Sequence, residues 1–426
     1  MRTQWLSILM VCVMLALTAC APGGSAQAKV VKSDKARIVA PSASADDIAE
    51  LAAGNSAFAF DLYQAIRSKE GNLFYSPYSI SLALAMTYAG AQGLTAQQMA
   101  DVLHFTLSQA NLHPAFNALD LALASRSQGA KGKDDKGFRL NIANSIWGQA
   151  DYKFLSAFLD TLAENYGAGL RLADFKKAPD ESRKIINDWV MEQTEDRIKD
   201  LIPEGAITPL TRLVLANAIY FNAAWLHPFE EENTIDAPFY LLDGGQISVP
   251  TMRQSEFFGY VEGDGFQALE LPYDGNEMSM VILMPGSGEF AAFEGALDAA
   301  TVESILSGLE RTNINLSMPK FKYETTLGLT DTLQQMGMTD AFSMSADFSG
   351  MDGTRDLFIT DVLHKAFVAV DEAGTEAAAA TAVIVGLKAM PAPPLDVKID
   401  QPFIFLIRDI QTGTILFVGR VLNPAA

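Results

Sequence analysis

This 426-residue chain contains four histidines, the side chains that most often serve as general acids and bases. No two of its four histidines have the spacing of metal ligands, and no HExxH motif occurs. A zinc hydrolase is therefore not expected. The four histidines are His104, His113, His227 and His364.

Candidate serine nucleophiles lack their usual surroundings as well. The GxSxG motif of α/β-hydrolases is absent, and the Gly-Ser-Gly stretch at residues 286–288 is typical of a turn. Ser317 and Lys320 match the SxxK motif of penicillin-binding enzymes, but Pro319 and the alternating residues 313–316 favour a strand there. No SDN or KTG motif accompanies them. We expect no enzyme, no cofactor and no metal site.

One segment near the C-terminus has a composition that neither a core element nor a catalytic site explains. Residues 368–394 have the sequence VAVDEAGTEAAAATAVIVGLKAMPAPP. Its alanine run favours a short exposed helix by propensity, but three β-branched residues, a glycine and a proline-rich exit follow. Small side chains at successive positions would let the segment lie exposed in one state and form a buried strand in another. We take it as the candidate functional segment.

The first part of the chain, which must help to position this segment, has helical periodicity. Apolar residues between 51 and 66 recur on one helix face, and residues 79–89 are apolar on nearly all sides, as in a buried helix. Thr95 is suited to cap a short helix over residues 96–103. A more polar amphipathic pattern over residues 181–199 predicts another helix.

Strands dominate later. Residues 213–221 form an almost continuous apolar run, as expected of a strand buried on both faces. Two hairpins are predicted, one from residues 268–271 and 278–283 and one from residues 403–407 and 414–418. Helices first and strands later, without βαβ alternation, indicate an α+β fold in one large domain.

Several motifs in the same order along residues 46–424 resemble the serpin family. The sequence DEAGTEAAAAT at residues 371–381 is similar to the hinge of inhibitory serpins, and NAIYFNAAW at residues 217–225 resembles their third central strand and the turn after it. Further stretches that resemble the family are NLFYSPYSI at 72–80, HKA at 364–366, QPFIF at 401–405 and FVGRVLNP at 417–424.

The resemblance implies a serpin fold, with a mainly antiparallel central sheet, further sheets, surrounding helices and an exposed reactive-centre loop over about residues 372–394. It also implies a suicide-substrate mechanism. A serine protease attacks the loop and forms an acyl-enzyme, the freed hinge inserts as an extra central strand, and the protease is carried to the opposite pole, where deacylation stalls. The partner is then a target protease in a covalent complex, and the chain itself is expected to be a monomer.

The resemblance also assigns residue roles. In the inserted strand the side chains that would face inward are small and uncharged, namely Thr375, Ala377, Ala379 and Thr381, whereas Glu376 would face solvent. Trp225 matches the aromatic side chain where insertion begins, and a polar cluster beneath the opening strands is matched by Ser76, Ser79, Asn217 and His364. The hinge comprises Glu372, Gly374, Thr375, Glu376, Ala377, Ala378, Ala379, Ala380 and Thr381.

The reactive bond follows from a count along the loop. With Gly374 as the first position, Lys388 is the fifteenth, where inhibitory serpins usually have the residue before the scissile bond, and Ala389 follows it. A lysine fits proteases whose specificity pocket holds a carboxylate, so trypsin-like targets are expected. A shift by one residue would place Leu387 at this position and favour chymotrypsin-like or cysteine proteases.

The N-terminus indicates export. One charged residue, Arg2, precedes the apolar residues 5–17, as in a secretory signal peptide. The following Leu-Thr-Ala-Cys resembles the bacterial lipobox, which predicts a lipoprotein signal peptide over residues 1–19 and a lipid on Cys20. In an envelope with two membranes, Ala21 after the cysteine favours the outer membrane. The protein could be exposed at the cell surface or released from it. The alternative is an ordinary signal peptide with an incidental cysteine.

Residues 20–45 are rich in Ser, Ala, Gly and Pro without an apolar period, so we expect a flexible, lipid-anchored tether before a domain over residues 46–426. The formal charge of −20 argues against a nucleic-acid partner. Two other functions stay open at this point. A serpin fold could act as a non-inhibitory carrier or chaperone, or the chain could be a lipid-anchored hydrolase or binding protein, which hydrolysis of ester or peptide substrates would reveal.

Overall fold

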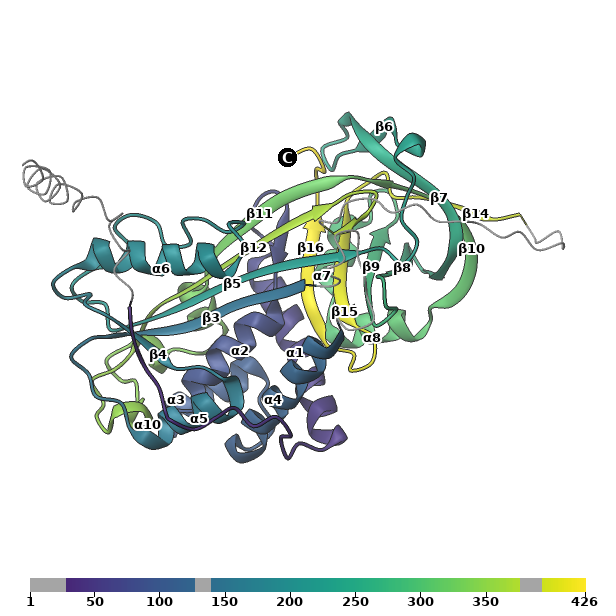
Figure 1. The fold of residues 1–426 in the computed structure, drawn as a ribbon. Helices are drawn as coiled ribbons and strands as arrows, with labels where there is room; N and C mark the ends of the chain where they lie inside the picture. The colour runs from purple at the N-terminus through teal and green to yellow at the C-terminus, as the bar shows by residue number, and fades with distance from the viewer. Residues whose placement is uncertain (1–27, 127–138, 376–392) are drawn as a thin grey trace, which may run out of the picture.

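The computed structural model of the chain describes residues 28–126, 139–375 and 393–426. Two mixed, mostly antiparallel β-sheets run through it (Figure 1). The seven-stranded central sheet has the spatial order β1 (Lys29–Val31), β4 (Leu170–Ala173), β3 (Arg139–Gln149), β5 (Leu213–Ala224), β13 (Gly374–Thr375), β12 (Ile359–Val370) and β11 (Phe321–Gly328).

The second sheet has nine strands and packs beside the central one. Its order is β14 (Leu395–Lys398), β10 (Glu310–Pro319), β7 (Gln246–Gly263), β8 (Phe266–Pro272), β9 (Met278–Pro285), β15 (Phe403–Asp409), β16 (Ile415–Val421) and β2 (Leu73–Tyr75), with β6 (Ile235–Tyr240) paired to β7.

Helices cover both faces of the central sheet. Figure 1 shows α6 on one face and α1 to α5 on the other. The helices in the described residues are α1 (Ala45–Ile66), α2 (Pro77–Tyr88), α3 (Gly93–Leu103), α4 (Gln109–Ser125), α5 (Ser156–Tyr166), α6 (Pro179–Gln193), α7 (Phe290–Ala296), α8 (Ala299–Ser307), α9 (Thr330–Met336) and α10 (Ser349–Asp352), with 3-10 turns at Glu231–Asn233 and Asp340–Phe342.

Two apolar cores result from this arrangement. The larger core lies between the sheets and α1, α2 and α4. The smaller core lies under α6, where Ile186 and Val190 pack on small β5 residues such as Ala216 and Ala218. The centre of the sheet is therefore buried on both faces, as the continuous apolar sequence of β5 requires.

Most predicted elements are confirmed. The helix expected over residues 79–89 is α2, and all twelve of its residues are buried. The apolar run of residues 213–221 is β5, and the two hairpins are β8–β9 and β15–β16. The stretch with the chance SxxK match lies at the end of β10, which is a strand.

Two helix boundaries were wrong. Thr95 does not cap α3, which begins at Gly93 after Gln92; its hydroxyl instead accepts a hydrogen bond from the Asp347 backbone N–H, at 2.9 Å. The helix predicted over residues 181–199 ends at Gln193. The backbone of Glu195 and Asp196 then adopts positive φ angles of 51° and 61°, which a right-handed helix does not permit.

The expectation of a flexible tether over residues 20–45 is wrong for residues 28–45. Residues 29–31 form β1, an added edge strand of the central sheet, and Ser44 caps α1 through a reciprocal capping box with Asp47. Residues 20–27 lie outside the described part of the chain.

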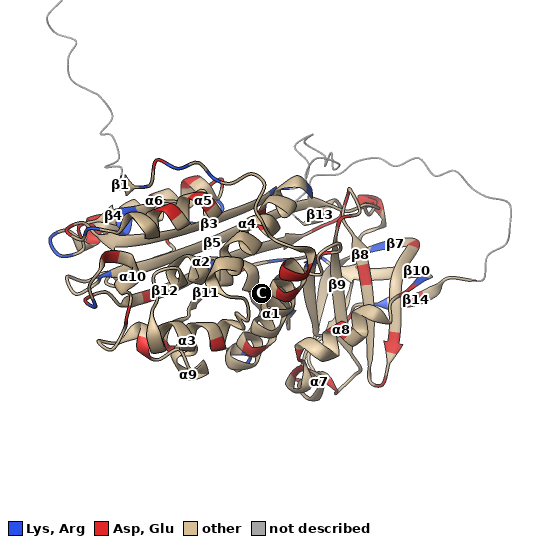
Figure 2. Ribbon diagram, turned by 90° about the horizontal axis from the view of Figure 1, so that it is seen from below, with Lys and Arg blue, Asp and Glu red and all other residues tan. Residues whose placement is uncertain are grey.

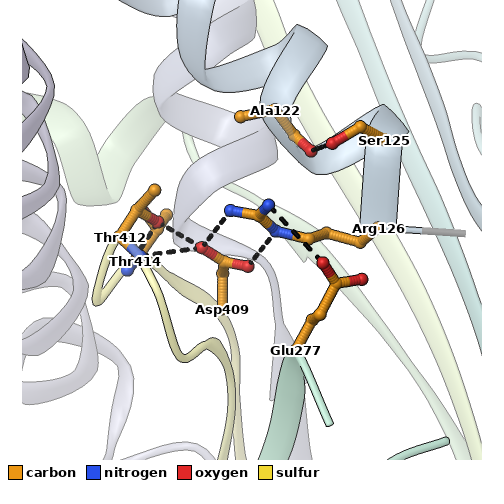
Figure 3. Close-up of polar contacts among 7 residues, drawn as sticks. All are labelled: Ala122, Ser125, Arg126, Glu277, Asp409, Thr412 and Thr414. Carbon is orange, nitrogen blue, oxygen red and sulfur yellow. Dashed lines mark hydrogen bonds and ion pairs between the residues drawn. The ribbon is translucent and has the colours of Figure 1, made fainter. Parts of the chain in front are cut away.

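A buried ion pair joins the end of α4 to the β15–β16 hairpin (Figure 3). The Arg126 Nε donates to Asp409 Oδ1 at 2.7 Å, and Glu277 Oε1 lies 3.8 Å from the same guanidinium group. Asp409 also accepts from the Thr412 backbone N–H, at 2.9 Å, and from its hydroxyl group, at 2.7 Å. The fully buried carboxylate is thereby compensated on both oxygens.

Within the described residues, no helix is long and apolar enough to cross a membrane.

Candidate functional site

The central sheet has a parallel seam between its two longest neighbouring strands. β5 and β12 run in the same direction and pair from Leu213–Ile359 to Tyr220–Phe367, with a bulge near Asp361. Every other pairing of these two strands is antiparallel. Because a strand inserted between them in the opposite direction would be antiparallel to both, the seam has the geometry of a vacant strand position.

The first residues of the hinge already occupy one end of this seam. Gly374 and Thr375 form β13, which pairs antiparallel with β5 at Ala224 and Ala223 and with β12 at Val370. A Cβ atom on Gly374 would lie only 2.1 Å from the Ala223 carbonyl oxygen, so this close approach requires glycine.

Thr375 is fully buried and faces the core. Its hydroxyl lies 2.7 Å from the Tyr273 hydroxyl, and burial raises the pKa of Tyr273 so that the phenol stays neutral. The Tyr273 ring stacks on Trp225 at 4.7 Å, and the Trp225 indole N–H donates to the Asp371 carbonyl at 3.0 Å. Trp225 therefore lies beside the first hinge residues, and its role at the start of insertion stays a prediction; Tyr273 was not foreseen.

The expected exposed loop over residues 372–394 is wrong at its beginning, because residues 372–375 are buried. Glu372 has 6% of its surface exposed. Its carboxylate accepts from Lys320 Nζ and from the Thr234 hydroxyl, each at 2.7 Å, and its carbonyl accepts from the Phe229 N–H at 2.8 Å. Although burial opposes the charge, these hydrogen bonds lower the pKa of Glu372. Lys320, considered above only as part of a chance motif, is thus a hinge partner.

The four predicted polar residues lie together in the middle of the seam. His364 and Asn217 are direct register partners on β12 and β5, and the His364 Nδ1 is bonded to the Asn217 Oδ1. The Ser76 N–H donates to His364 Nε2 at 3.2 Å, while Asn217 Nδ2 donates to the Ser79 hydroxyl at 2.6 Å. Asn144 on β3 is a further member, which donates to the Ser79 carbonyl at 2.9 Å.

This cluster ties the N-terminus of α2 to three strands of the central sheet. Both imidazole nitrogens of His364 have partners that suit the neutral ring, and complete burial lowers the pKa of His364 to about 3. A strand that entered the seam this far would have to separate His364 from Asn217. The cluster is therefore placed to hold the seam closed.

Several site residues lie outside the described residues: Glu376, Ala377, Ala378, Ala379, Ala380, Thr381, Lys388 and Ala389, as well as Cys20. The structure describes the two ends of the loop. One end is β13 in the central sheet, and the other is β14, which pairs in parallel with β10 at the edge of the second sheet. Among the described residues, no group of His, Cys, Asp and Glu side chains could hold a metal ion.

A parallel seam with the first hinge residues paired to both of its strands at one end is the feature that the central sheet shows. The family described as "Serpin (serine protease inhibitor)" matches residues 53–424. The chain belongs to the serpin family.

Known relatives and solved structures are similar to this chain over most of their own length. The chain is 41% identical to a serpin-like protein of Thermococcus kodakarensis, over 87% of this chain and 84% of that one. It is 40% identical to human leukocyte elastase inhibitor, over 88% of this chain and the whole of that one. The native-state crystal structure of the thermophilic serpin tengpin has a TM-score of 0.81 at 30% identity, covering 93% of this chain and all of tengpin.

Proposed function

We propose that this chain inhibits serine proteases as a suicide substrate, and that its cleaved loop inserts between β5 and β12. The seam carries this proposal, because β13 is antiparallel to both strands and marks where a longer strand would enter. Insertion would replace one parallel pairing with two antiparallel ones, which are slightly more stable per residue. Similarity to leukocyte elastase inhibitors supports the same function.

The small residues of the hinge support inhibition rather than a carrier role. The positions that follow Thr375 on the same strand face are Ala377, Ala379 and Thr381. Continued beyond β13, they would enter a closely packed core without a charge or a bulky group to bury.

We further propose that the target is a trypsin-like protease cleaving between Lys388 and Ala389. The test is to mix purified protein with trypsin, elastase, subtilisin and papain, and to look for complexes that survive denaturing electrophoresis. Mass spectrometry of the released C-terminal peptide reports the cleaved bond. We expect a stable complex with trypsin and a peptide that begins at Ala389.

A Lys388→Ala variant should form this complex orders of magnitude more slowly, since the carboxylate in the protease pocket loses its partner. A peptide beginning after Leu387 or Met390 in the wild type would contradict the assigned bond. Cleavage of the loop by all four proteases without any stable complex would contradict inhibition itself.

We also propose that Cys20 carries a lipid that anchors the inhibitor to a bacterial envelope. A Cys20→Ser substitution should move the protein from the detergent phase to the soluble fraction, while trypsin inhibition persists. Wild-type protein that is wholly soluble after export would contradict the anchor.

A further inference from the structure

The residues just before α1 form a strap, defined here as residues 28–44, that is built onto the domain. Its strand β1 pairs antiparallel with β4, with Lys29 opposite Leu172 and Val31 opposite Leu170. Three paired positions at a sheet edge are a small contact, but they extend the central sheet by one strand (Figure 2).

A glycine lets the strap approach closely. A Cβ atom on Gly169 would lie 2.8 Å from the Val31 carbonyl oxygen and 2.8 Å from the Lys32 Cβ, and 3.0 Å from Val30. All three nearest atoms belong to the strap. A side chain at this position would therefore collide with the strap, whereas the Gly169 backbone, which has no positive φ angle, would accept one.

Polar contacts continue along the strap onto α5 and α4. Lys35 forms ion pairs with Asp160 at 3.2 Å and Glu164 at 2.9 Å, both on α5. Arg37 reaches α4, where its guanidinium group lies 2.6 Å from the Asp120 carboxylate. The strap is thus bound at several points rather than only at β1.

The strand registers define the end of the sheet at which the strap lies. β4 pairs with the Trp147–Gln149 end of β3, and that end of β3 pairs with the beginning of β5 near Leu213. The hinge pairs with the other end of β5, at Ala223 and Ala224. Eleven residues separate these ends, which is about 36 Å along an extended strand.

The direction of β1 also matters. β5 runs toward the hinge, β3 and β4 run away from it, and β1, being antiparallel to β4, runs toward it again. Preceding residues therefore reach β1 from the pole opposite the hinge. We call this end, which includes β1 and the start of β5, the distal pole.

We propose that the strap orients the inhibitor on its membrane, holding the distal pole against the lipid surface and the reactive-centre loop away from it. This inference rests on the proposed anchoring through Cys20. Lys29, the first residue of β1, is nine residues from Cys20, so the anchor lies within about 32 Å of the distal pole. Without the strap, the chain would be free as far as α1, 25 residues from Cys20, with a reach of about 90 Å.

The test attaches the protein chemically, so that it does not depend on lipidation in cells. Residues 20–426 contain a single cysteine, Cys20, which can be coupled to a maleimide lipid in phosphatidylcholine vesicles that also carry a lipid-bound energy acceptor. A fluorescent non-natural amino acid replaces either exposed Leu210, at the distal pole, or exposed Glu231, near the hinge. We expect several-fold stronger energy transfer to the membrane from position 210 than from position 231.

A Gly169→Val substitution should displace the strap and reduce this difference, while inhibition of trypsin in detergent solution stays unchanged. The matched control is Gly295→Val, on an exposed part of α7, where a Cβ would meet nothing closer than 3.9 Å. Equal transfer from both positions in the wild type, or stronger transfer from position 231, would overturn the proposal, as would an unchanged difference in Gly169→Val. Failure of the proposed anchoring appears separately, as soluble wild-type protein in cells.

Discussion

At the scale of single residues, Thr375 lies at the most sensitive position of the site. It is fully buried between β5 and β12, and its hydroxyl is satisfied by Tyr273. The next residues of the loop must follow it into the same seam if the chain acts as proposed. A change at Thr375 therefore acts on insertion and not on the distant reactive bond.

A Thr375→Arg substitution should convert the inhibitor into a substrate. An uncompensated charge in the core costs at least several kcal/mol, so the residue at this position leaves β13 and the strand can no longer extend from it. Insertion then slows while the loop remains cleavable, and deacylation releases the protease. The measurement is the number of inhibitor molecules cleaved per protease trapped. Glu376→Arg, one residue further and on the opposite strand face, is the matched control and should change this ratio far less. Stable complexes at the wild-type ratio in Thr375→Arg would exclude strand insertion as the trapping step.

His364 makes the seam sensitive to acid. Its pKa is lowered from 6.5 to about 3 in the folded protein, so below pH 6.5 the unfolded chain binds a proton that the folded chain does not. The free energy of unfolding should therefore fall as the pH falls from 6.5 toward 3, by up to about 1.4 kcal/mol per pH unit from this residue.

The contribution of His364 is the difference between the wild type and a His364→Asn variant in urea midpoints measured across this pH range. The variant should have a shallower slope, although it keeps His113, whose pKa burial lowers to about 4. Parallel slopes in the two proteins would show that His364 is not kept neutral by the folded state.

At the scale of elements, local pattern predicted those helices and strands whose burial is uniform. α2 and β5 are apolar on all sides and were found where expected. β1 could not be predicted, because three residues between polar neighbours form a strand only by pairing with β4, some 140 residues later. The end of α6 was missed because two acidic residues adopt left-handed conformations, which a helical pattern does not reveal.

The candidate site could be predicted only in part, because it also depends on contacts between residues that are distant in the sequence. The resemblance supplied Ser76, Ser79, Asn217, His364 and Trp225, and the structure brings the first four together. Asn144, Tyr273 and Lys320 were missed, because their roles depend on contacts across more than fifty residues. No local spacing in the sequence records such contacts.

The junction of α4 with the β15–β16 hairpin should depend on its buried ion pair. An Asp409→Ala substitution leaves the mostly buried Arg126 guanidinium without its main partner, and we expect the free energy of unfolding to fall by about 3 kcal/mol. Urea denaturation monitored by circular dichroism measures this change. Lys184→Ala, which breaks an exposed pair with Asp180, is the control and should leave the urea midpoint nearly unchanged. A similar midpoint for all three proteins would show that the buried pair does not stabilise the fold.

At the scale of the whole molecule, the intact protein retains a parallel seam, which its own loop fills under the proposed mechanism. A loop cut at Lys388 would extend β13 along β5 and β12. Roughly ten new backbone hydrogen bonds, each with a net value of about 1 kcal/mol, would raise the melting temperature by roughly 20 °C, at about 2 °C per kcal/mol.

Calorimetry of intact and loop-cleaved protein checks this expectation. Cleaved Thr375→Arg should gain much less, because the loop can extend β13 only if the charged side chain at position 375 stays buried. An unchanged melting temperature after cleavage in the wild type would mean that the loop does not enter the seam.

The location of β1 limits the space available to a captured enzyme. Under the proposed mechanism the protease travels to the distal pole, which the anchored strap keeps within about 32 Å of the membrane. A protease of roughly 230 residues is about 45 Å across, too wide for this clearance. The domain must therefore tilt or the strap must detach, and either movement consumes part of the free energy that insertion releases. On a membrane, loop insertion is thus expected to perform mechanical work on the domain or the strap. Insertion in solution does not require this work.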